Sequence, residues 1–345
     1  MMPEIRDGLR VYRDHDYFET SEGWIFCVVS DLHPPGRILS YLKYVRGGGP
    51  WMRGGVGYAR MLRSYSMREV GATLDFVKSR NPGYIFRDPY VGEEFTYPPT
   101  DAVVSHYRPE ERLRMILDDP SWERERQCGR LAEYLSEGSH QLLTYMGVTG
   151  SLLPGLRYEK ADIDMVVYGG QNYRRVLDVA EGLQSPESRR RLERHFTSSI
   201  LGRYPVTGDD AARLFTRVRS KGFFEGVQFS IHAVRALNEV RVGYGVRVYR
   251  GAGLARAVLK VVDASDSLFM PAVYGVEELE GGYGVETLTC YDSSFAGLFS
   301  EDDVLEVVGK LEDVWDSFEG RSYRNILIGS LKGVGVEYVR ILRPP

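Results

Sequence analysis

The sequence predicts an α+β protein in which a helix-rich middle region lies between two β-rich ends. The first third of the chain holds short aromatic runs separated by Gly and Pro turns, and the last third holds short β-branched runs separated by Gly and Asp. Between them, longer stretches carry helix-start signals, such as Pro109 followed by acidic residues. We therefore divide the 345 residues into an N-terminal segment (1–105), a mixed core (106–240) and a C-terminal domain (241–345).

In the N-terminal segment, residues 17–20 and 24–29 predict two strands joined by a Ser-Glu-Gly turn. A Pro-Pro-Gly turn precedes a third predicted strand at 38–45. After the glycine cluster at 47–49, the pattern predicts a helix from about Val56 to Tyr65.

The core begins with a helix at Pro109 and continues with a longer predicted helix at about 121–145, which leads into a short strand at Val148. Further helices are expected near 172–183, 186–200 and 208–219.

In the C-terminal domain, the sequence predicts seven short strands, which suggest a small β-barrel or sandwich. Its role is either substrate binding, or structural or partner binding. The runs are 246–249, 257–262, 272–276, 285–290, 304–308, 323–328 and 336–342. Gly251 to Arg256 resembles a dinucleotide-binding turn, but the residues after it predict a strand where that fold needs a helix.

The composition is that of an ordinary globular chain, with 43% hydrophobic and 27% charged residues, so disordered and fibrous classes are excluded. No apolar stretch approaches the ~18 residues that a membrane span needs. We expect a cytoplasmic protein without membrane association and with buried thiols at Cys27, Cys128 and Cys290. Arg exceeds Lys, and Asn and Gln are scarce, which is compatible with a thermophilic source.

The most informative motif is a Gly-Ser turn at Gly150 and Ser151, followed by Asp162, Ile163 and Asp164. Side chains alternate along a strand, so the two aspartates share one face while Ile163 enters the core. Mg²⁺ is bound through one or two carboxylates together with substrate phosphates. Glycine lets backbone approach a phosphate closely, and serine offers a hydroxyl. The alternative is a solvated turn before an edge strand, against which the apolar run 165–168 argues.

The segments Val148 to Ser151 and Asp162 to Met165 resemble the signature of the DNA polymerase beta-like nucleotidyltransferase superfamily, with Thr149 at a usually apolar position. The resemblance implies a nucleotidyltransferase-like core in which Asp162 and Asp164 bind Mg²⁺ or Mn²⁺ and Gly150 and Ser151 hold the phosphates of a nucleoside triphosphate. The two other Gly-Ser pairs of the chain are not followed by paired acids.

The superfamily usually has a third carboxylate on the neighbouring strand, and here the expected strand is 223–234. Its centre holds Gln228 and Ser230, so Glu225 is the only candidate, reaching the site through a bulge at Gly226. The alternatives are that His232 or Gln228 does part of the work, or that the site binds nucleotide without turnover.

Between residues 186 and 221, nine basic and four acidic residues give a local charge of +5, against −4 for the whole chain. Arg217, Arg219 and Lys221 are therefore candidate phosphate or nucleic-acid contacts. For the arginines between 189 and 194, a solvated helix face is the alternative.

The whole chain also resembles a predicted nucleotidyltransferase family of archaea, through the Asp-x-Asp region at 162–164 and the stretches His33 to Gly36 and Phe229 to Ile231. This second resemblance implies no substrate, whereas the superfamily resemblance implies metal-dependent transfer of a nucleotidyl group to a hydroxyl of RNA, protein or a small molecule. The alternatives are a degenerate nucleotide- or RNA-binding protein with the same fold, and an interaction scaffold without nucleotide affinity.

Overall fold

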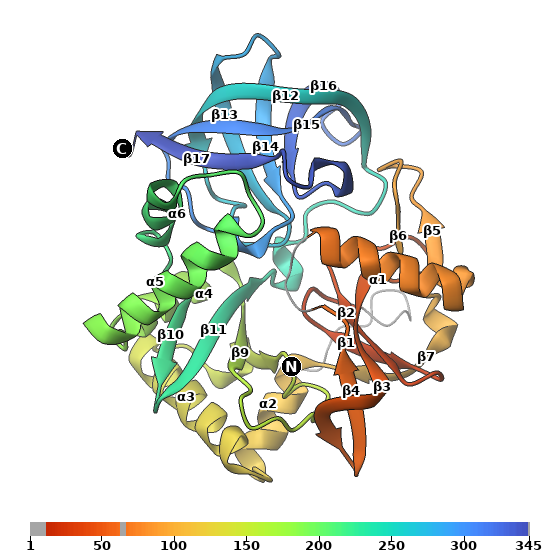
Figure 1. The fold of residues 1–345 in the computed structure, drawn as a ribbon, viewed down its shortest axis with the longest axis vertical. Coiled ribbons are helices and arrows are strands. Elements are labelled where there is room, and N and C mark those ends of the chain that lie inside the picture. Colours follow the sequence, from red (N-terminus) through yellow and green to blue (C-terminus); the bar gives the residue numbers. More distant parts are fainter. Residues whose placement is uncertain (1–11, 63–66, 344–345) are drawn as a thin grey trace.

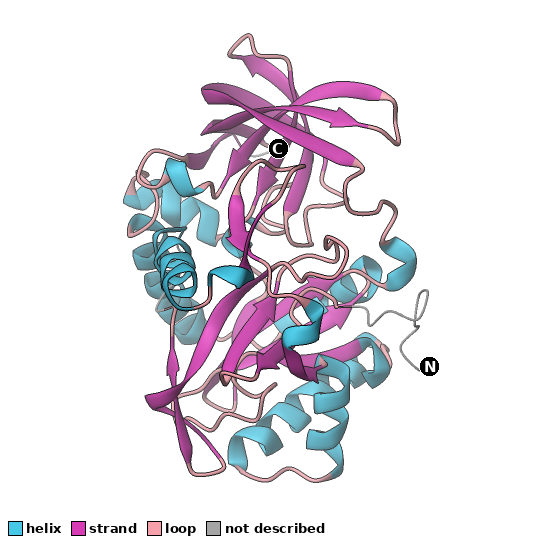
Figure 2. Ribbon diagram, turned by 90° about the vertical axis from the view of Figure 1, so that its right-hand side faces the viewer, coloured by secondary structure: helices cyan, strands magenta, loops and turns pink. Residues whose placement is uncertain are grey.

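The computed structural model describes residues 12–62 and 67–343 and shows an α+β protein with three main sheets. The C-terminal strands form one end of the molecule, and the N-terminal sheet and the helix-rich middle region lie side by side below them (Figure 1). Figure 2 shows that helices flank the middle sheet and are sparse around the C-terminal strands. Among the helices of the described ranges, none combines the length and the apolar character that a bilayer crossing requires.

The N-terminal sheet has the order β4-β3-β2-β1-β7. A helix, α1 (Met67–Arg80), and a small hairpin accompany it, and an aromatic core of Phe18, Phe26 and Tyr84 lies on one face. The strands are β1 (Tyr17–Thr20), β2 (Trp24–Val28), β3 (Ser40–Arg53), β4 (Val56–Arg60) and β7 (Val103–Tyr107), and the hairpin is β5 (Ile85–Arg87) with β6 (Glu94–Thr96).

The predicted helix from Val56 is wrong, because residues 56–60 form strand β4. Gly54 and Gly55 both have positive φ, at 56° and 78°, and they make a tight turn that returns the chain antiparallel to β3. The pairing of Arg53 with Val56 fixes this hairpin. Residues 63–65 of the expected helix lie outside the described residues.

The middle sheet has the order β10-β11-β9-β8, in which only β9 and β11 are parallel. The predicted strand at Val148 and the predicted helices are confirmed, although the helices expected at 121–145 and 208–219 end earlier, at Ser139 and Phe215. The strands are β8 (Met146–Thr149), β9 (Ile163–Tyr168), β10 (Lys221–Phe224) and β11 (Val227–Val234). The helices are α2 (Pro109–Asp118), α3 (Glu123–Ser139), α4 (Gly170–Glu181), α5 (Pro186–Leu201) and α6 (Gly208–Phe215).

One face of the middle sheet forms a hydrophobic core with helices α2, α3 and α4. Ile163, Met165 and Val167 alternate along β9 and are buried against Leu131 of α3 and Val176 of α4. Because side chains alternate, the residues between them point to the opposite face. That opposite face carries the two aspartates of the motif.

Helices α5 and α6 pack against the C-terminal sheet. Phe196 of α5 and Phe215 of α6 share a buried core with Leu259, Leu305 and Ile326 of C-terminal strands. The segment between β9 and β10 therefore joins the middle region to the C-terminal sheet.

The C-terminal strands pair in a closed cycle, β12-β13-β14-β16-β15 and back to β12, and β17 also pairs with β15. The segment Gly251 to Arg256 lies inside β12 and is not followed by a helix, so it is not a dinucleotide-binding turn, as expected. The strands are β12 (Arg247–Asp263), β13 (Ala272–Glu280), β14 (Val285–Cys290), β15 (Val304–Asp316), β16 (Arg321–Ile328) and β17 (Tyr338–Arg343). All three cysteines are buried and free.

The first turn of α2 packs directly on Gly147 of β8. A Cβ at Gly147 would lie 2.5 Å from Pro109 Cβ and 2.8 Å from Glu110 N, distances that force the helix and the strand apart. We expect Gly147→Ala to lower the free energy of unfolding by about 1–3 kcal/mol, measured by denaturant titration. Gly208→Ala is the control, because nothing lies within 4 Å of the added Cβ, and its effect should stay within about 0.5 kcal/mol. Equal effects of the two changes would contradict this packing.

Candidate functional site

A row of polar residues crosses all four strands of the middle sheet. Thr149 of β8 pairs with Asp164 of β9, and Asp164 pairs with Ser230 of β11. Ser230 in turn pairs with Lys221 of β10. Residues that pair across neighbouring strands project from the same face, so these four side chains lie together on the face opposite the helical core.

The two halves of the sequence motif meet at this row. Gly150 follows Thr149 with a φ of 68°, and a Cβ built on it would lie 2.2 Å from Asp164 Oδ2. Only glycine allows this approach of backbone to carboxylate, and it also adopts the left-handed conformation without strain. Ser151 is buried beside it. The structure therefore brings together Gly150, Ser151, Asp162 and Asp164.

The two aspartates titrate differently. The negative charge of Asp164, followed by burial, raises the pKa of Asp162 to about 6. Burial opposes ionisation of Asp164, yet its pKa is lowered by the nearby His232 and Lys43 and by a hydrogen bond of 2.5 Å from Ser230 Oγ. The paired charges are thus mutually unfavourable, and a cation between them would relieve the repulsion.

The aspartates open onto a cavity of about 1800 Å³ whose walls come from all three regions of the chain. Basic side chains gather on the wall near the acids. They are Lys43 of β3, Arg60 of β4, Arg124 of α3, Lys160 of the loop before β9, and Lys221 of β10. This charge distribution suits an anionic ligand that also carries a cation.

Arg124 is a basic residue of this wall with unused donors. Its Nη2 donates to Glu159 O at 2.8 Å, whereas its buried Nε and Nη1 have no hydrogen-bond partner within the described ranges. Burial lowers the pKa of Arg124, and the attraction of Asp162 opposes this effect. Buried donors without partners are costly, so this guanidinium group is suited to bind an anionic oxygen next to Asp162.

Glu225 is not brought to the acids. It lies at the turn between β10 and β11 with a φ of 48°, and its carboxylate is bound by Arg130 of α3 at 2.6 and 2.9 Å. It does not line the cavity. The positions beside the two aspartates on β11 are occupied by Gln228 and Ser230, as the register Phe229 to Ile163 requires.

The three predicted basic contacts separate in the structure. Arg217 binds Asp303 at 3.0 Å, and Arg219 binds Asp178 and Glu181 at 2.6 and 2.9 Å. Neither lines the cavity. Lys221 does, and no hydrogen bond or ion pair joins its ammonium group to another described residue. Burial lowers the pKa of Lys221.

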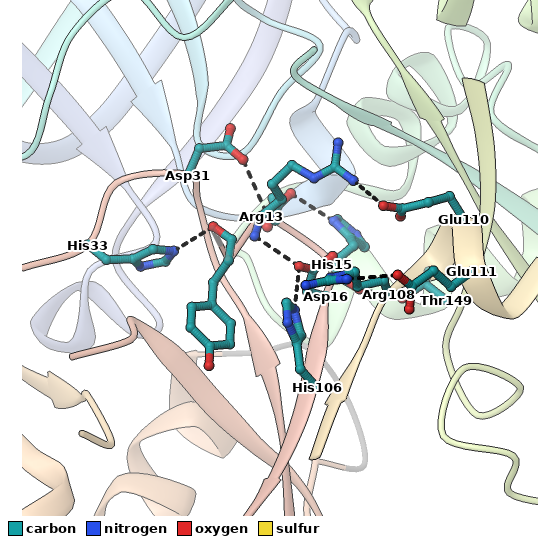
Figure 3. A network of polar contacts seen from close by, with 12 residues as sticks. Arg13, His15, Asp16, Asp31, His33, His106, Arg108, Glu110, Glu111 and Thr149 are labelled. Atoms are coloured by element: carbon teal, nitrogen blue, oxygen red, sulfur yellow. Dashed lines mark hydrogen bonds and ion pairs between the residues drawn. The ribbon is translucent and has the colours of Figure 1, made fainter. Parts of the chain in front are cut away.

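An Asp-His pair from the N-terminal segment also reaches the polar row. His15 Nδ1 lies 2.7 Å from Asp14 Oδ2, and the His15 ring packs on the ring of His232 with centroids 4.6 Å apart. His232 Nε2 lies 2.9 Å from Ser230 Oγ. Figure 3 shows His15 beside Thr149, whose Oγ1 donates to His15 O at 3.0 Å.

His33, by contrast, is a structural residue. Its Nε2 donates to Tyr12 O at 3.1 Å, and its Nδ1 accepts from Leu39 N at 3.2 Å; Figure 3 shows the His33 ring. Burial lowers its pKa to about 4, so it stays neutral and holds two loops together.

The donor set fits a cation that takes only part of its coordination from protein. Asp162 and Asp164 supply carboxylate oxygens on one face, whereas no group of three His, Cys, Asp or Glu residues is arranged to hold a metal within residues 12–62 and 67–343. Mg²⁺ commonly binds one or two carboxylates and completes its shell with waters and phosphates. Mg²⁺ or Mn²⁺ with a bound nucleotide is therefore compatible with this pair.

Comparison with known proteins gives one near full-length relative. The chain is 25% identical over 348 aligned positions to an uncharacterised protein, MJ1086, of the archaeon Methanocaldococcus jannaschii, and the alignment covers 96% of this chain and 99% of the relative. No protein-family model matches the chain, and no solved structure matches it significantly. The similarity to an archaeal protein thus extends over all three regions and not over the motif alone.

Proposed function

We propose that this protein is a metal-dependent nucleotidyltransferase that moves a nucleotidyl group from a nucleoside triphosphate to a hydroxyl acceptor. The observation that carries the proposal is the close approach of Gly150 to Asp164 on the cavity face of the middle sheet. It places a backbone turn next to a pair of carboxylates. We interpret the middle region as a nucleotidyltransferase-like core and the closed C-terminal strands as a small barrel.

Each residue of the site has a role in this proposal. Asp162 and Asp164 bind Mg²⁺ or Mn²⁺, which would supply neutralisation of the developing charge on the phosphates. Gly150 and Ser151 contact the terminal phosphates. Arg124 and Lys221 approach from the two flanks of the acids. They replace Arg217 and Arg219, whose guanidinium groups are held by acidic partners.

The volume of the cavity is compatible with two substrates bound at once. Small-molecule sites usually occupy about 300–1,000 Å³, whereas this cavity measures about 1800 Å³. A nucleotide would therefore leave room for part of an acceptor, such as an RNA end or a small molecule. Most of the rate enhancement would come from positioning and charge neutralisation.

A nucleotide-binding protein without turnover is the second candidate. It is favoured by Ser230 and Gln228, which occupy the positions where a third carboxylate would face the pair, and by the placement of Glu225 in an ion pair with Arg130. The two candidates share the binding site and differ only in the fate of the nucleotide.

Calorimetric titration with each of the four ribonucleoside triphosphates tests the binding site. We expect Mg²⁺-dependent binding by the wild-type protein and its loss in the Asp162→Ala, Asp164→Ala double variant, because the cation would lose both carboxylates. Glu225→Gln is the matched control and should bind like wild type, since Glu225 lies outside the cavity. Absence of binding for all four nucleotides would overturn both candidates.

The contact between Gly150 and Asp164 can be tested with two glycines of the same loop. Gly150 and Gly155 have almost the same φ, 68° and 71°, but a Cβ at Gly155 meets only Arg112 Nη2, at 3.9 Å. Gly150→Ala should displace Asp164 and weaken Mg²⁺-nucleotide binding by about 10–100-fold. Gly155→Ala should cost stability through backbone strain and leave the affinity unchanged. Equal losses of affinity would show that loop strain alone is responsible.

The raised pKa of Asp162 predicts a stability change that depends on pH. Its folded-state pKa of about 6 exceeds the ordinary value of 3.8, so ionisation at higher pH destabilises the folded protein. Without divalent cations, Asp162→Asn should unfold at a higher temperature than wild type at pH 8. The difference should shrink as the pH falls through 6 and vanish below about 4. Saturating Mg²⁺ should stabilise wild type more than the variant, and a constant difference at every pH would contradict the assignment.

A further inference from the structure

The proposed transfer needs a group that accepts the proton of the attacking hydroxyl. A carboxylate on β11 would serve, but the β11 residues beside the aspartates are Gln228 and Ser230. His232 is a poor acceptor, because burial lowers its pKa to about 3 and its Nε2 already contacts Ser230 Oγ. Strand β11 thus offers no suitable proton acceptor beside the aspartates, whereas another element that lines the cavity does.

The segment before β1 supplies such a group in His15. Its Nδ1 contacts Asp14 Oδ2 at 2.7 Å, which assigns the Nδ1 proton to that hydrogen bond in the neutral ring and leaves the lone pair on Nε2. His15 lines the cavity, and Nε2 has no hydrogen-bond partner among residues 12–62 and 67–343. A carboxylate that orients one ring nitrogen while the other faces substrate is the arrangement of a general base.

Several contacts fix this pair next to the polar row. Arg13 Nη2 binds Glu110 Oε1 at 2.6 Å, which anchors the segment to the first turn of α2 (Figure 3). Thr149 Oγ1 donates to His15 O at 3.0 Å from the end of β8. Thr149 therefore has a role at the position where the superfamily signature has an apolar residue.

The backbone of His15 is strained, with a φ of 67°. A residue other than glycine is disfavoured in this conformation and persists there only where its surroundings impose it. Here the hydrogen bonds of His15 N to Val28 O, at 3.2 Å, and of Thr149 to His15 O impose it. The result is a ring packed against His232 within the site, with the two ring planes tilted by 32°.

The charged groups around His15 favour its protonated form. Burial alone would lower its pKa, and Lys43 of β3 acts in the same direction. The charge and the hydrogen bond of Asp14, together with the charge of Asp164, outweigh both, so the pKa of His15 is raised above 6.5. His232, the ring packed against it, stays neutral at that pH.

A second Asp-His pair, between Asp16 and His106 of β7, shows the difference between a structural and an accessible imidazole. His106 Nε2 lies 2.8 Å from Asp16 Oδ2, and both side chains are only 2% exposed (Figure 3). Neither residue lines the cavity, so this pair cannot reach a ligand.

We propose that His15, held by Asp14, accepts the proton of the acceptor hydroxyl in the nucleotidyl transfer, a role that rests on the proposed function. The hydroxyl oxygen forms a bond to the α-phosphorus while its proton passes to His15 Nε2. The bond from the α-phosphorus to the bridging oxygen breaks, and pyrophosphate leaves with the electron pair. His15 then returns the proton to solvent.

The test measures pyrophosphate release between pH 5 and 9 from the four ribonucleoside triphosphates with Mg²⁺, offering RNA 3′ ends, glycerol and water as hydroxyls. The wild-type rate should rise with pH through the pKa of His15, because only the neutral ring accepts a proton. His15→Asn should lower the plateau rate by about 10²–10⁴-fold and abolish the rise of the rate with pH. Asp14→Asn should move this rise to lower pH.

His140→Asn is the matched control. His140 also has a positive φ, 54°, it is exposed at the end of α3, and it does not line the cavity. Asparagine tolerates this conformation at both positions, so a change seen only in His15→Asn is not a consequence of backbone strain. An unchanged pH profile in His15→Asn would overturn the proposal.

A second readout does not require turnover. Nitrogen NMR of histidine-labelled protein without metal or nucleotide should show His15 protonated at Nδ1 and titrating above 6.5, and Asp14→Asn should remove both features. Calorimetry separates the remaining outcomes. Nucleotide binding without pyrophosphate release from any hydroxyl overturns the role of His15 and leaves the binding site, whereas absence of binding overturns the proposed function itself.

Discussion

The site depends on one constraint, which is that a backbone turn must pack closely against a pair of carboxylates. Asp164 fits against Gly150 only because position 150 has no side chain. The opposite face of β9 is committed to the helical core through Ile163 and Met165, so the aspartates cannot turn away from each other. Because side chains alternate along a strand, burial of the apolar residues on one face places the two aspartates together on the other face.

Much of the architecture could be predicted from local sequence patterns. Helices with clear start signals, such as α2 at Pro109 and α5 at Pro186, lie where they were expected. The prediction of a helix at Val56 is wrong, because these residues are compatible with a helix or a strand. The tight turn at Gly54 and Gly55 favours a hairpin. The Gly-Ser and Asp-x-Asp halves of the site were predictable because they lie within one short segment joined by β8 and β9.

The rest of the site could not be predicted, because it is assembled from distant segments. Lys43, Arg124 and His15 reach the acids from β3, α3 and the segment before β1, and nothing in their neighbouring residues indicates this. Arg219 shows the converse, since a basic residue close in sequence to the site is held by Asp178 and Glu181 of α4. The position of a basic residue close to a motif in sequence does not determine which acidic residue it pairs with in the folded protein.

The packing of α5 and α6 on the C-terminal sheet limits how this protein can be divided in evolution. These helices lie between β9 and β10 in sequence, yet their apolar faces are completed by residues such as Leu259 and Ile326. A gene fragment that ended after β11 would leave that apolar surface without its cover. The middle region could not be recombined freely with other partners, so the chain would be inherited as a single unit.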